Sequence, residues 1–179
     1  MNPASPLILR PARPDDAPAL AHLHVTVWRE TYATLAPAQA MALLDEALRL
    51  RQWRAALADP DRACLLVERG GEVLGMVATA APVEPAFGPR GEIRHLHVAA
   101  TARRLGLGAQ LLQAACDRVS QDGFAGAGLG VVAQNTAART FYAAMGGREA
   151  GAYADPGPLW RSEMVLVVWD APLSAPRPR

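Results

Sequence analysis

Lysine is absent from this chain of 179 residues, in which all 18 basic residues are arginine. The acidic residues number 17, and the resulting net charge of +1 gives no general attraction to nucleic acid or to a membrane surface. Cysteine is scarce as well: Cys64 and Cys116 are too few for a disulfide framework and too isolated for a zinc site. We therefore expect neither nucleic acid nor a membrane as a partner.

Long apolar runs are also missing. No stretch approaches the roughly 18 uncharged apolar residues that a membrane-spanning helix needs, and the first residues contain neither the basic region nor the apolar run of a signal peptide. Hydrophobic residues nevertheless make up 51% of the sequence, which is enough to form a core and excludes a disordered chain. We expect a cytoplasmic protein with one domain over residues 1–170 and a disordered tail over 171–179.

The apolar pattern predicts alternating strands and helices. The expected strands are residues 7–10, 63–69, 72–78, 93–98, 129–132 and 164–169, and one further strand is possible before the last. The expected helices begin near Pro14, Pro37, Leu107 and Thr136, and the second ends before Asp59. This order indicates an α/β protein with a mixed sheet, hairpins at its ends and βαβ crossovers in its middle.

Glycine and arginine gather where the strand at 93–98 ends and the next helix begins. The residues are Arg103, Arg104, Gly106 and Gly108. Glycine allows a ligand to approach the backbone closely, and the unpaired amide groups at a helix N-terminus attract an anion. The segment suits a pyrophosphate, although an ordinary strand-to-helix turn with two solvated arginines has the same composition.

Two common nucleotide-binding motifs do not fit this segment. A P-loop needs a lysine, which the chain lacks. A dinucleotide fingerprint needs a glycine or alanine three places after its second glycine, where this chain has Leu111.

The segment instead matches the pattern Arg/Gln-x-x-Gly-x-Gly/Ala, and here the chain resembles the GNAT family of acyl-CoA-dependent N-acetyltransferases. The strand from Glu92 to Val98 is similar to the family's fourth strand. The family's second motif, Asn-x-x-Ala-x-x-Phe-Tyr, is matched on the following helix by Asn135, Ala138, Phe141 and Tyr142. The resemblance covers residues 7–169 and implies a single-domain GNAT fold with a mixed, mainly antiparallel sheet that has helices on both faces.

The resemblance implies acetyl-CoA as the co-substrate. Backbone groups of Leu96, His97 and Val98 are expected to pair with the pantetheine arm, to which Asn135 also bonds. Arg103 or Arg104 is expected near phosphate. The amides expected to cradle the pyrophosphate are those of Arg104, Leu105, Gly106, Leu107, Gly108 and Ala109.

Transfer of an acetyl group from a thioester to an amine needs an acid and the removal of a proton. Tyr142 is the expected acid, because a phenol with a pKa of about 10 can donate to a thiolate of similar basicity; packing in the core is its alternative role. Glu92 is the expected base, acting through a water, and an ion pair with Arg90 or Arg94 is its alternative role. Glu30, a main-chain carbonyl or no dedicated base at all remain open.

Three further side chains have two interpretations each. Trp28 and Tyr32 lie one helical turn apart and either line the acceptor pocket or pack in the core. Cys116 lies within the helix that follows the glycines and is expected in the core rather than as a nucleophile.

The histidines invite a metal hypothesis. His95 and His97 share one face of a regular strand, but no third ligand can be recognised, so no metal is expected. His22 and His24 lie two residues apart on a helix and point in different directions, and neither is assigned a role.

The sequence supports two functions. The first is an N-acetyltransferase that moves the acetyl group to a primary amine by direct attack within a ternary complex. The second is a non-catalytic module of the same fold that binds acyl-CoA for sensing. The acceptor, a small-molecule or peptide amine, stays open, as do the length of the acyl chain and the choice between a monomer and a homodimer.

Overall fold

The computed structural model describes residues 5–155, 157 and 160–170. Its strands are β1 (Ile8–Pro11), β2 (Arg62–Arg69), β3 (Glu72–Ala80), β4 (Gly91–Val98), β5 (Ala127–Val132), β6 (Arg148–Ala154) and β7 (Glu163–Trp169). Its helices are α1 (Ala17–Tyr32), α2 (Ala38–Leu43), α3 (Glu46–Ala58), α4 (Leu107–Gln121) and α5 (Thr136–Ala144). Short 3-10 turns are η1 (Pro14–Asp16), η2 (Pro85–Phe87) and η3 (Ala100–Ala102).

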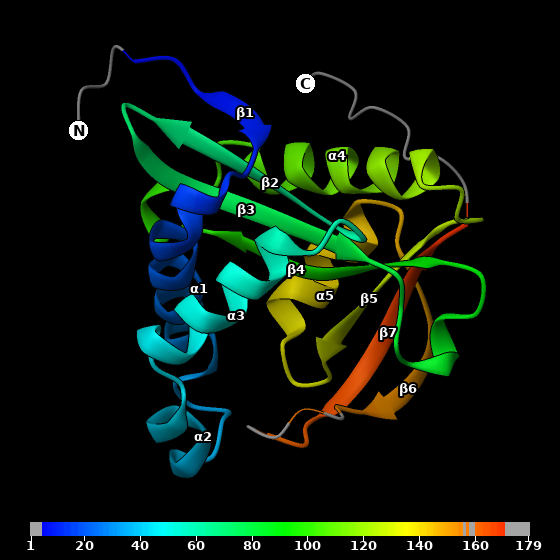
Figure 1. Cartoon of the computed structure of the whole chain (residues 1–179). Helices are drawn as coiled ribbons and strands as arrows, with labels where there is room; N and C mark the ends of the chain where they lie inside the picture. The colour runs from blue at the N-terminus through cyan, green and yellow to red at the C-terminus, as the bar shows by residue number, and fades with distance from the viewer. Residues whose placement is uncertain (1–4, 156, 158–159, 171–179) are drawn as a thin grey trace.

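The seven strands form one sheet in the order β1-β2-β3-β4-β5-β7-β6 (Figure 1). All neighbouring strands are antiparallel except β4 and β5. The sheet is therefore mixed and mainly antiparallel, as the resemblance implies. The sequence predicts several βαβ crossovers in the middle, whereas the described chain has one parallel pair, because β7 returns antiparallel beside β5.

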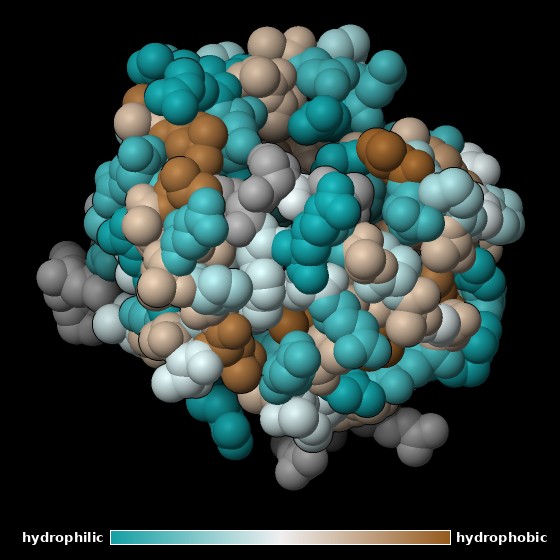
Figure 2. Space-filling view, turned by 90° about the horizontal axis from the view of Figure 1, so that it is seen from below, coloured by the Kyte–Doolittle hydropathy of each residue, from teal (hydrophilic) through white to brown (hydrophobic). Residues whose placement is uncertain are grey.

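Helices cover both faces of the sheet. α4 packs on β2 to β5, while α1 and α3 pack together on the other face against β2 to β4 (Figure 1). Successive side chains of a strand point to opposite faces, so Leu66 and Met76 join the core beneath α1, while Val67 and Val77 join the core beneath α4. Figure 2 views the end of the molecule that carries α2 and the β6–β7 connection, where hydrophilic and hydrophobic side chains are mixed.

Local sequence signals explain most element boundaries. The Asp16 carboxylate, next to the start of α1, accepts hydrogen bonds from Arg10 Nη1 and from the Arg13 amide, both at 2.7 Å. Gly70 and Gly71 both have positive φ and form the predicted turn between β2 and β3.

The helix expected between Pro37 and Asp59 is in fact two helices. Leu44 and Asp45 have extended backbone between α2 and α3. Asp45 Oδ1 accepts a hydrogen bond from the Leu48 amide at 2.6 Å, so this carboxylate caps α3 and starts a new helix. The periodic apolar residues hide this break, because Leu44 remains fully buried on the same side.

The end of the chain contains two strands, β6 and β7, of which the apolar pattern defined only the second. The tail at 171–179, predicted to be disordered, lies outside the described residues. No helix in the described part of the chain has both the length and the apolar character needed to span a bilayer.

Candidate active site

The central feature of the site is the separation of β4 from β5. The two strands pair only at Gly91 with Ala127 and at Glu92 with Gly128. Beyond Glu92, the β5-facing edge of β4 has no strand partner in the described chain, while the other edge stays paired with β3. Leu96, His97 and Val98, predicted to pair with an extended arm, lie on this unpaired segment.

The glycine loop ends in an anion-binding geometry. Gly106 has a φ of 78° directly before α4, and Arg104 has a φ of 66°, a left-handed conformation that is uncommon outside glycine. The amides from Arg104 to Ala109 donate no hydrogen bond to another group of the described chain, whereas the Gln110 amide donates to the Gly106 carbonyl. A run of free amides at the positive end of a 15-residue helix suits a phosphate.

The two arginines of the loop differ. Arg103 Nη2 forms an ion pair with Glu30 Oε2 at 2.9 Å, and its Nε donates to the Val98 carbonyl at 3.3 Å. These contacts tie the loop to α1 and β4. They also show that Glu30, an open candidate for the base, pairs with an arginine at the surface.

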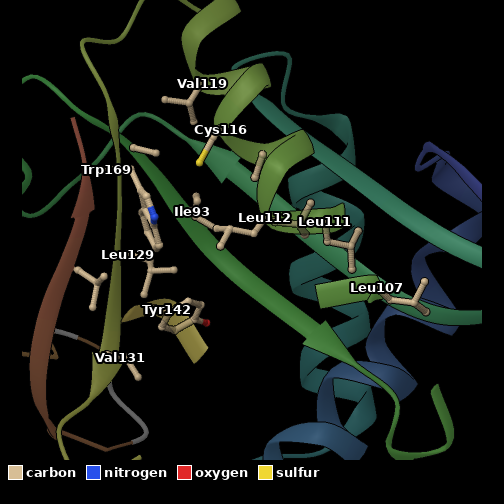
Figure 3. Packing of buried hydrophobic residues seen from close by; sticks show 14 of the residues in the cluster. Ile93, Leu107, Leu111, Leu112, Cys116, Val119, Leu129, Val131, Tyr142 and Trp169 are labelled. Atoms are coloured by element: carbon tan, nitrogen blue, oxygen red, sulfur yellow. The ribbon is translucent and has the colours of Figure 1, made fainter. Parts of the chain in front are cut away.

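Tyr142 lies on α5 between β5 and β4, with its hydroxyl turned toward β4 (Figure 3). Its side chain is only 8% exposed and packs edge-on against Phe141 and Trp169, with ring centres 5.3 and 5.9 Å away. Burial, and secondarily the nearby Tyr32, raise the pKa of Tyr142 well above its usual value. The phenol is therefore protonated at neutral pH, as a proton donor must be.

Asn135 and Tyr32 meet near Tyr142. The Asn135 side-chain oxygen caps α5 by accepting from the Ala138 amide at 3.2 Å, so its amide nitrogen, with two N–H groups, is the side-chain donor that faces Tyr32 or a ligand. Burial raises the pKa of the Tyr32 phenol, and a hydrogen bond with Asn135 opposes this rise. Trp28 and Tyr32 pack against each other, with ring centres 5.2 Å apart, but neither belongs to a buried core cluster of the described chain.

Trp160, from the β6–β7 connection, completes an aromatic cluster with Trp28 and Tyr32. Its ring centre lies 6.5 Å from Trp28 and 5.7 Å from Tyr32, nearly perpendicular to both. All three side chains are half-buried. The cluster is therefore both a packing unit and an apolar surface beside Tyr142.

Glu92 lies at the point where β4 and β5 part. Burial raises the pKa of its carboxyl group, and Arg94, whose Nη2 lies 3.2 Å from Glu92 Oε2, opposes the rise. The ion pair with Arg94 proposed as its alternative role is thus present. A half-buried carboxylate with a raised pKa is a stronger base than a solvated one.

Asp155 connects these groups, although no sequence motif indicated it. Its negative charge adds to the larger effect of burial in raising the pKa of Glu92 and of Tyr32, and it opposes the lowering of the Arg49 pKa that burial causes. Asp155 is therefore close enough to Tyr32, Glu92 and Arg49 for its charge to act on all three. It directly follows β6, which ends at Ala154.

The histidines cluster on the α1 face of the sheet. His95 and His97 share that face, as predicted, and both rings lie 4.6 Å from the ring of His24, which is 2% exposed. Burial lowers the pKa of all three imidazoles, that of His97 to about 4, so they are neutral at neutral pH. The sequence did not identify His24 as the third member of the cluster, because a buried helix position does not indicate which strand its side chain faces. His22 points to the surface, where it contacts Glu46 at 2.8 Å.

The cysteines do not form a nucleophilic site. Cys116 is buried in the core beneath α4, as expected, and burial raises its pKa to about 12. Burial raises the pKa of Cys64 to about 12 as well. Both thiols are therefore protonated at neutral pH and are poor acyl acceptors.

Comparison with known proteins agrees with this geometry. The family described as the acetyltransferase (GNAT) family matches residues 23–146, and the chain belongs to this family. This confirms the resemblance found in the motifs. No curated protein sequence matches the chain.

Solved structures share the fold at low sequence identity. An N-acetyltransferase, PaiA, from Thermoplasma acidophilum in complex with coenzyme A has a TM-score of 0.66 and 15% identity, covering 90% of this chain and 98% of the other. YncA from Salmonella typhimurium, a putative acetyltransferase with its cofactor acetyl-CoA, has a TM-score of 0.70 and 19% identity, covering 97% and 99%. A ribosomal-protein-alanine N-acetyltransferase from Brucella melitensis has a TM-score of 0.70 and 23% identity, covering 92% and 99%.

Proposed function

We propose that this chain is an N-acetyltransferase that moves the acetyl group of acetyl-CoA to a primary amine by direct attack. One observation carries the proposal: the unpaired segment of β4 and the free amides before α4 lie on the side of the sheet where Tyr142 is buried. Donors for a phosphate, an edge for an extended arm and a proton donor are the three elements that a thioester of coenzyme A needs.

The donor is held mainly by backbone groups in this proposal. Amides from Arg104 to Ala109 bind the pyrophosphate, with Arg104 nearer to phosphate than Arg103, since Arg103 is engaged with Glu30. Backbone groups of Leu96 to Val98 bind the pantetheine arm on the open edge of β4, and the Asn135 side-chain nitrogen bonds to the same arm. Two solved structures with the same fold contain coenzyme A or acetyl-CoA, which supports this assignment.

Tyr142 supplies the proton to the leaving thiolate. The amine forms a C–N bond to the acetyl carbon, the C–S bond breaks, and the phenol hydrogen passes to sulfur. The raised pKa of Tyr142 does not oppose this step, because a thiolate formed in the same buried surroundings is also more basic than in water. Direct attack is favoured over an acyl-enzyme, because both cysteines have raised pKa values.

Glu92 accepts the proton that the attacking amine loses, through a water. Its raised pKa brings the carboxylate closer in basicity to the amine, and Arg94 opposes the rise by stabilising the ionised form. Trp28 and Tyr32 contact the apolar part of the acceptor, which is a small-molecule or peptide amine. The reaction as written uses no metal and no nucleic acid or membrane partner, and we propose that it takes place in the cytoplasm with a monomer or homodimer.

Release of free thiol from acetyl-CoA in the presence of a panel of amines tests the proposal, with Tyr142→Phe beside the wild type. Loss of the phenol is expected to lower kcat at least about tenfold on the best amine, while the ring and its packing are kept. Ser120→Ala removes a hydroxyl from an exposed position of α4 and is the control, and its kcat is expected to stay within about twofold. Thermal unfolding of both variants checks that the fold is intact.

Three results separate the alternatives. Turnover that falls only in Tyr142→Phe supports the enzyme and its acid. Tight binding of acetyl-CoA without thiol release from any amine indicates a sensing module instead. Absence of acetyl-CoA binding contradicts both functions.

A further inference from the structure

A cavity of about 440 Å³ lies on the face of the sheet opposite α4. It is enclosed by α1, α3 and the three strands β2, β3 and β4, and we call it the arginine cavity. Its polar and charged lining residues are His24, Arg49, Gln52, Arg62, Thr79, Arg94 and His95. The cavity is thus large enough for a small molecule and is rich in hydrogen-bond donors.

The charged side chains that line the arginine cavity are all positive. It is lined by three arginines and by no carboxylate of the described chain. Arg62 pairs with Asp59 at 2.9 Å and Arg94 with Glu92 at 3.2 Å. Arg49 has no carboxylate within ion-pair distance in the described chain, and its Nη1 donates only to Gln52 Oε1 at 2.6 Å. Arg49 is therefore a half-buried cation without a direct ion pair to the described residues; burial lowers its pKa, and the charge of Asp155 opposes this from beyond ion-pair distance.

Several polar atoms of the cavity lining lack partners. Nε of Arg49, Nε of Arg94, Oγ1 of Thr79 and Nδ1 of His24 are all buried and make no hydrogen bond within the described chain. The His24 and Thr79 side chains are only 2% and 4% exposed. A buried donor without an acceptor costs free energy, and a ligand that carries several acceptor oxygens removes that cost at each of these groups.

A metal ion is the rival occupant, because nitrogen atoms of His24, His95 and His97 lie within 4.8 Å of one another. Three histidines form a common zinc ligand set. However, the positive charge of Arg49 acts on all three imidazoles. The ring nitrogens without a partner in the described chain, Nδ1 of His24 and Nε2 of His97, can bind either a metal or a hydrogen-bonding ligand, so the charge of Arg49 is what separates the two. These surroundings favour an anion.

We propose that the arginine cavity binds the anionic group, a carboxylate or a phosphate, of the amine that is acetylated. This inference rests on the proposed function. Arg94 belongs to the cavity and also pairs with Glu92, the group assigned to the amine proton. The charge of Asp155 reaches both Arg49 and Glu92. One small acceptor can therefore place its amine near Glu92 and its anionic group near Arg49 and Arg94.

The test compares acceptors that differ only in the anionic group. The sets are L-phenylalanine, L-phenylalaninamide and phenethylamine; L-leucine, L-leucinamide and 3-methylbutylamine; and O-phosphoethanolamine with ethanolamine. We expect an anionic member to have the highest kcat/KM in at least one set. The amino groups of L-phenylalaninamide and L-leucinamide are less basic than those of the amino acids, so a larger fraction is neutral and able to attack. Without an anion site, these two amides would therefore be the better acceptors.

Variants locate the effect in the cavity. Arg49→Gln is expected to raise KM for the preferred anionic amine at least about tenfold and to change KM for its neutral partner by less than about twofold. Arg49→Lys restores part of the loss. Arg51→Gln removes the same charge from an exposed position of the same helix, and both KM values are expected to stay unchanged.

Direct binding keeps this inference separate from the proposed function. Without acetyl-CoA or amine, glutarate or inorganic phosphate is expected to raise the Tm of the wild type and not that of Arg49→Gln. If no amine is acetylated but this protection is seen, the proposed function fails while the cavity remains an anion site, and acceptor binding there is overturned. Turnover that prefers the neutral member of every set overturns the inference alone. Stabilisation by zinc that is lost in His24→Ala, without stabilisation by the anions, overturns it in favour of a metal.

Discussion

The two faces of β4 and its neighbours differ in how they are built. On the α4 face, the side chains are almost all apolar, and the groups available to a ligand belong to the backbone: the open edge of β4 and the free amides before α4. On the α1–α3 face, the available groups are side chains, chiefly arginine and histidine around a polar cavity. The proposed donor half of the site thus depends on backbone geometry, and the proposed acceptor half depends on which side chains the packing brings together.

This difference has an energetic counterpart. An apolar core gains stability from close packing and loses it with each cavity made. A polar cavity with unpartnered donors contributes little to stability and retains those donors at a cost. We interpret the α4 face as the part that stabilises the fold. On the α1–α3 face, unpartnered polar groups lower the free energy of unfolding but are available to a ligand.

The largest expected effect tests that interpretation directly. Leu112→Ala, in the fully buried core beneath α4, is expected to lower the free energy of unfolding by about 3 kcal/mol. Thr79→Val, which replaces an unpartnered buried hydroxyl by a methyl group of similar shape, is expected to leave stability unchanged or to raise it. Urea unfolding measures both. An equal loss in the two variants contradicts the division between the faces.

The next effect concerns the carboxylate between the two halves. Glu92 must be ionised to accept a proton, and burial raises its pKa above 4.5. Activity is therefore present above the folded-state pKa and is lost as the pH falls through it, at a higher pH than for a solvated glutamate. Glu92→Gln is expected to lower kcat/KM about 100-fold at neutral pH and to abolish this acid limb.

The pH profile of kcat/KM distinguishes the base from its neighbours. Glu163→Gln, at an exposed position of β7, is the control and is expected to keep the wild-type profile. If Glu92→Gln retains the acid limb, another group titrates there. Asp155, whose charge acts on Glu92, is then the residue to replace.

The structural elements of the proposed donor half were largely predictable from the sequence, while their role in binding stays a prediction. Gly106 and Gly108 lie between a strand and a helix, and the spacing of glycines over a few residues is enough to predict the local backbone geometry there. Asn135 and Tyr142 belong to one helix, so a single motif contains both. The separation of β4 from β5 was harder to predict, because it depends on strand pairing that stops after Glu92.

The acceptor half was not predictable for a physical reason. His24, Arg49, Arg94 and Trp160 come from four elements, and their convergence depends on how α1 and α3 cross the sheet. His24 occupies a buried helix position where any apolar residue would fit the pattern equally well. Arg49 lies on a helix whose surface carries several arginines, and only the packing of α3 separates it from Arg51 and Arg54.

Substitution of two glycines separates an effect on stability from an effect on donor binding. Gly106 and Gly71 have φ angles of 78° and 84°, and in both a new Cβ would meet nothing within 4 Å. Alanine at either position is therefore expected to cost about 1 kcal/mol through backbone strain alone. Only Gly106→Ala is expected to raise KM for acetyl-CoA, because relief of the strain turns the amides before α4. Equal KM values for the two variants would show that these amides do not hold the donor.

The smallest effect lies at the edge of the α1–α3 face, where Arg10 pairs with Asp16 at 2.7 Å and with Glu68 at 2.8 Å. The hydrogen bond from Arg10 holds the pKa of Asp16 below its ordinary value of 3.8. A lowered folded-state pKa contributes stability that is present above the unfolded pKa and is lost as the pH falls through the folded one. Asp16→Asn is expected to cost about 1 kcal/mol at neutral pH, since ion pairs near a surface contribute little. The difference from the wild type should begin to shrink as the pH falls below 3.8 and should vanish only below the lower folded-state pKa of Asp16. Asp15→Asn removes the same charge from the neighbouring residue, and a comparable loss there would mean that net charge, and not the bond to Arg10, sets the effect.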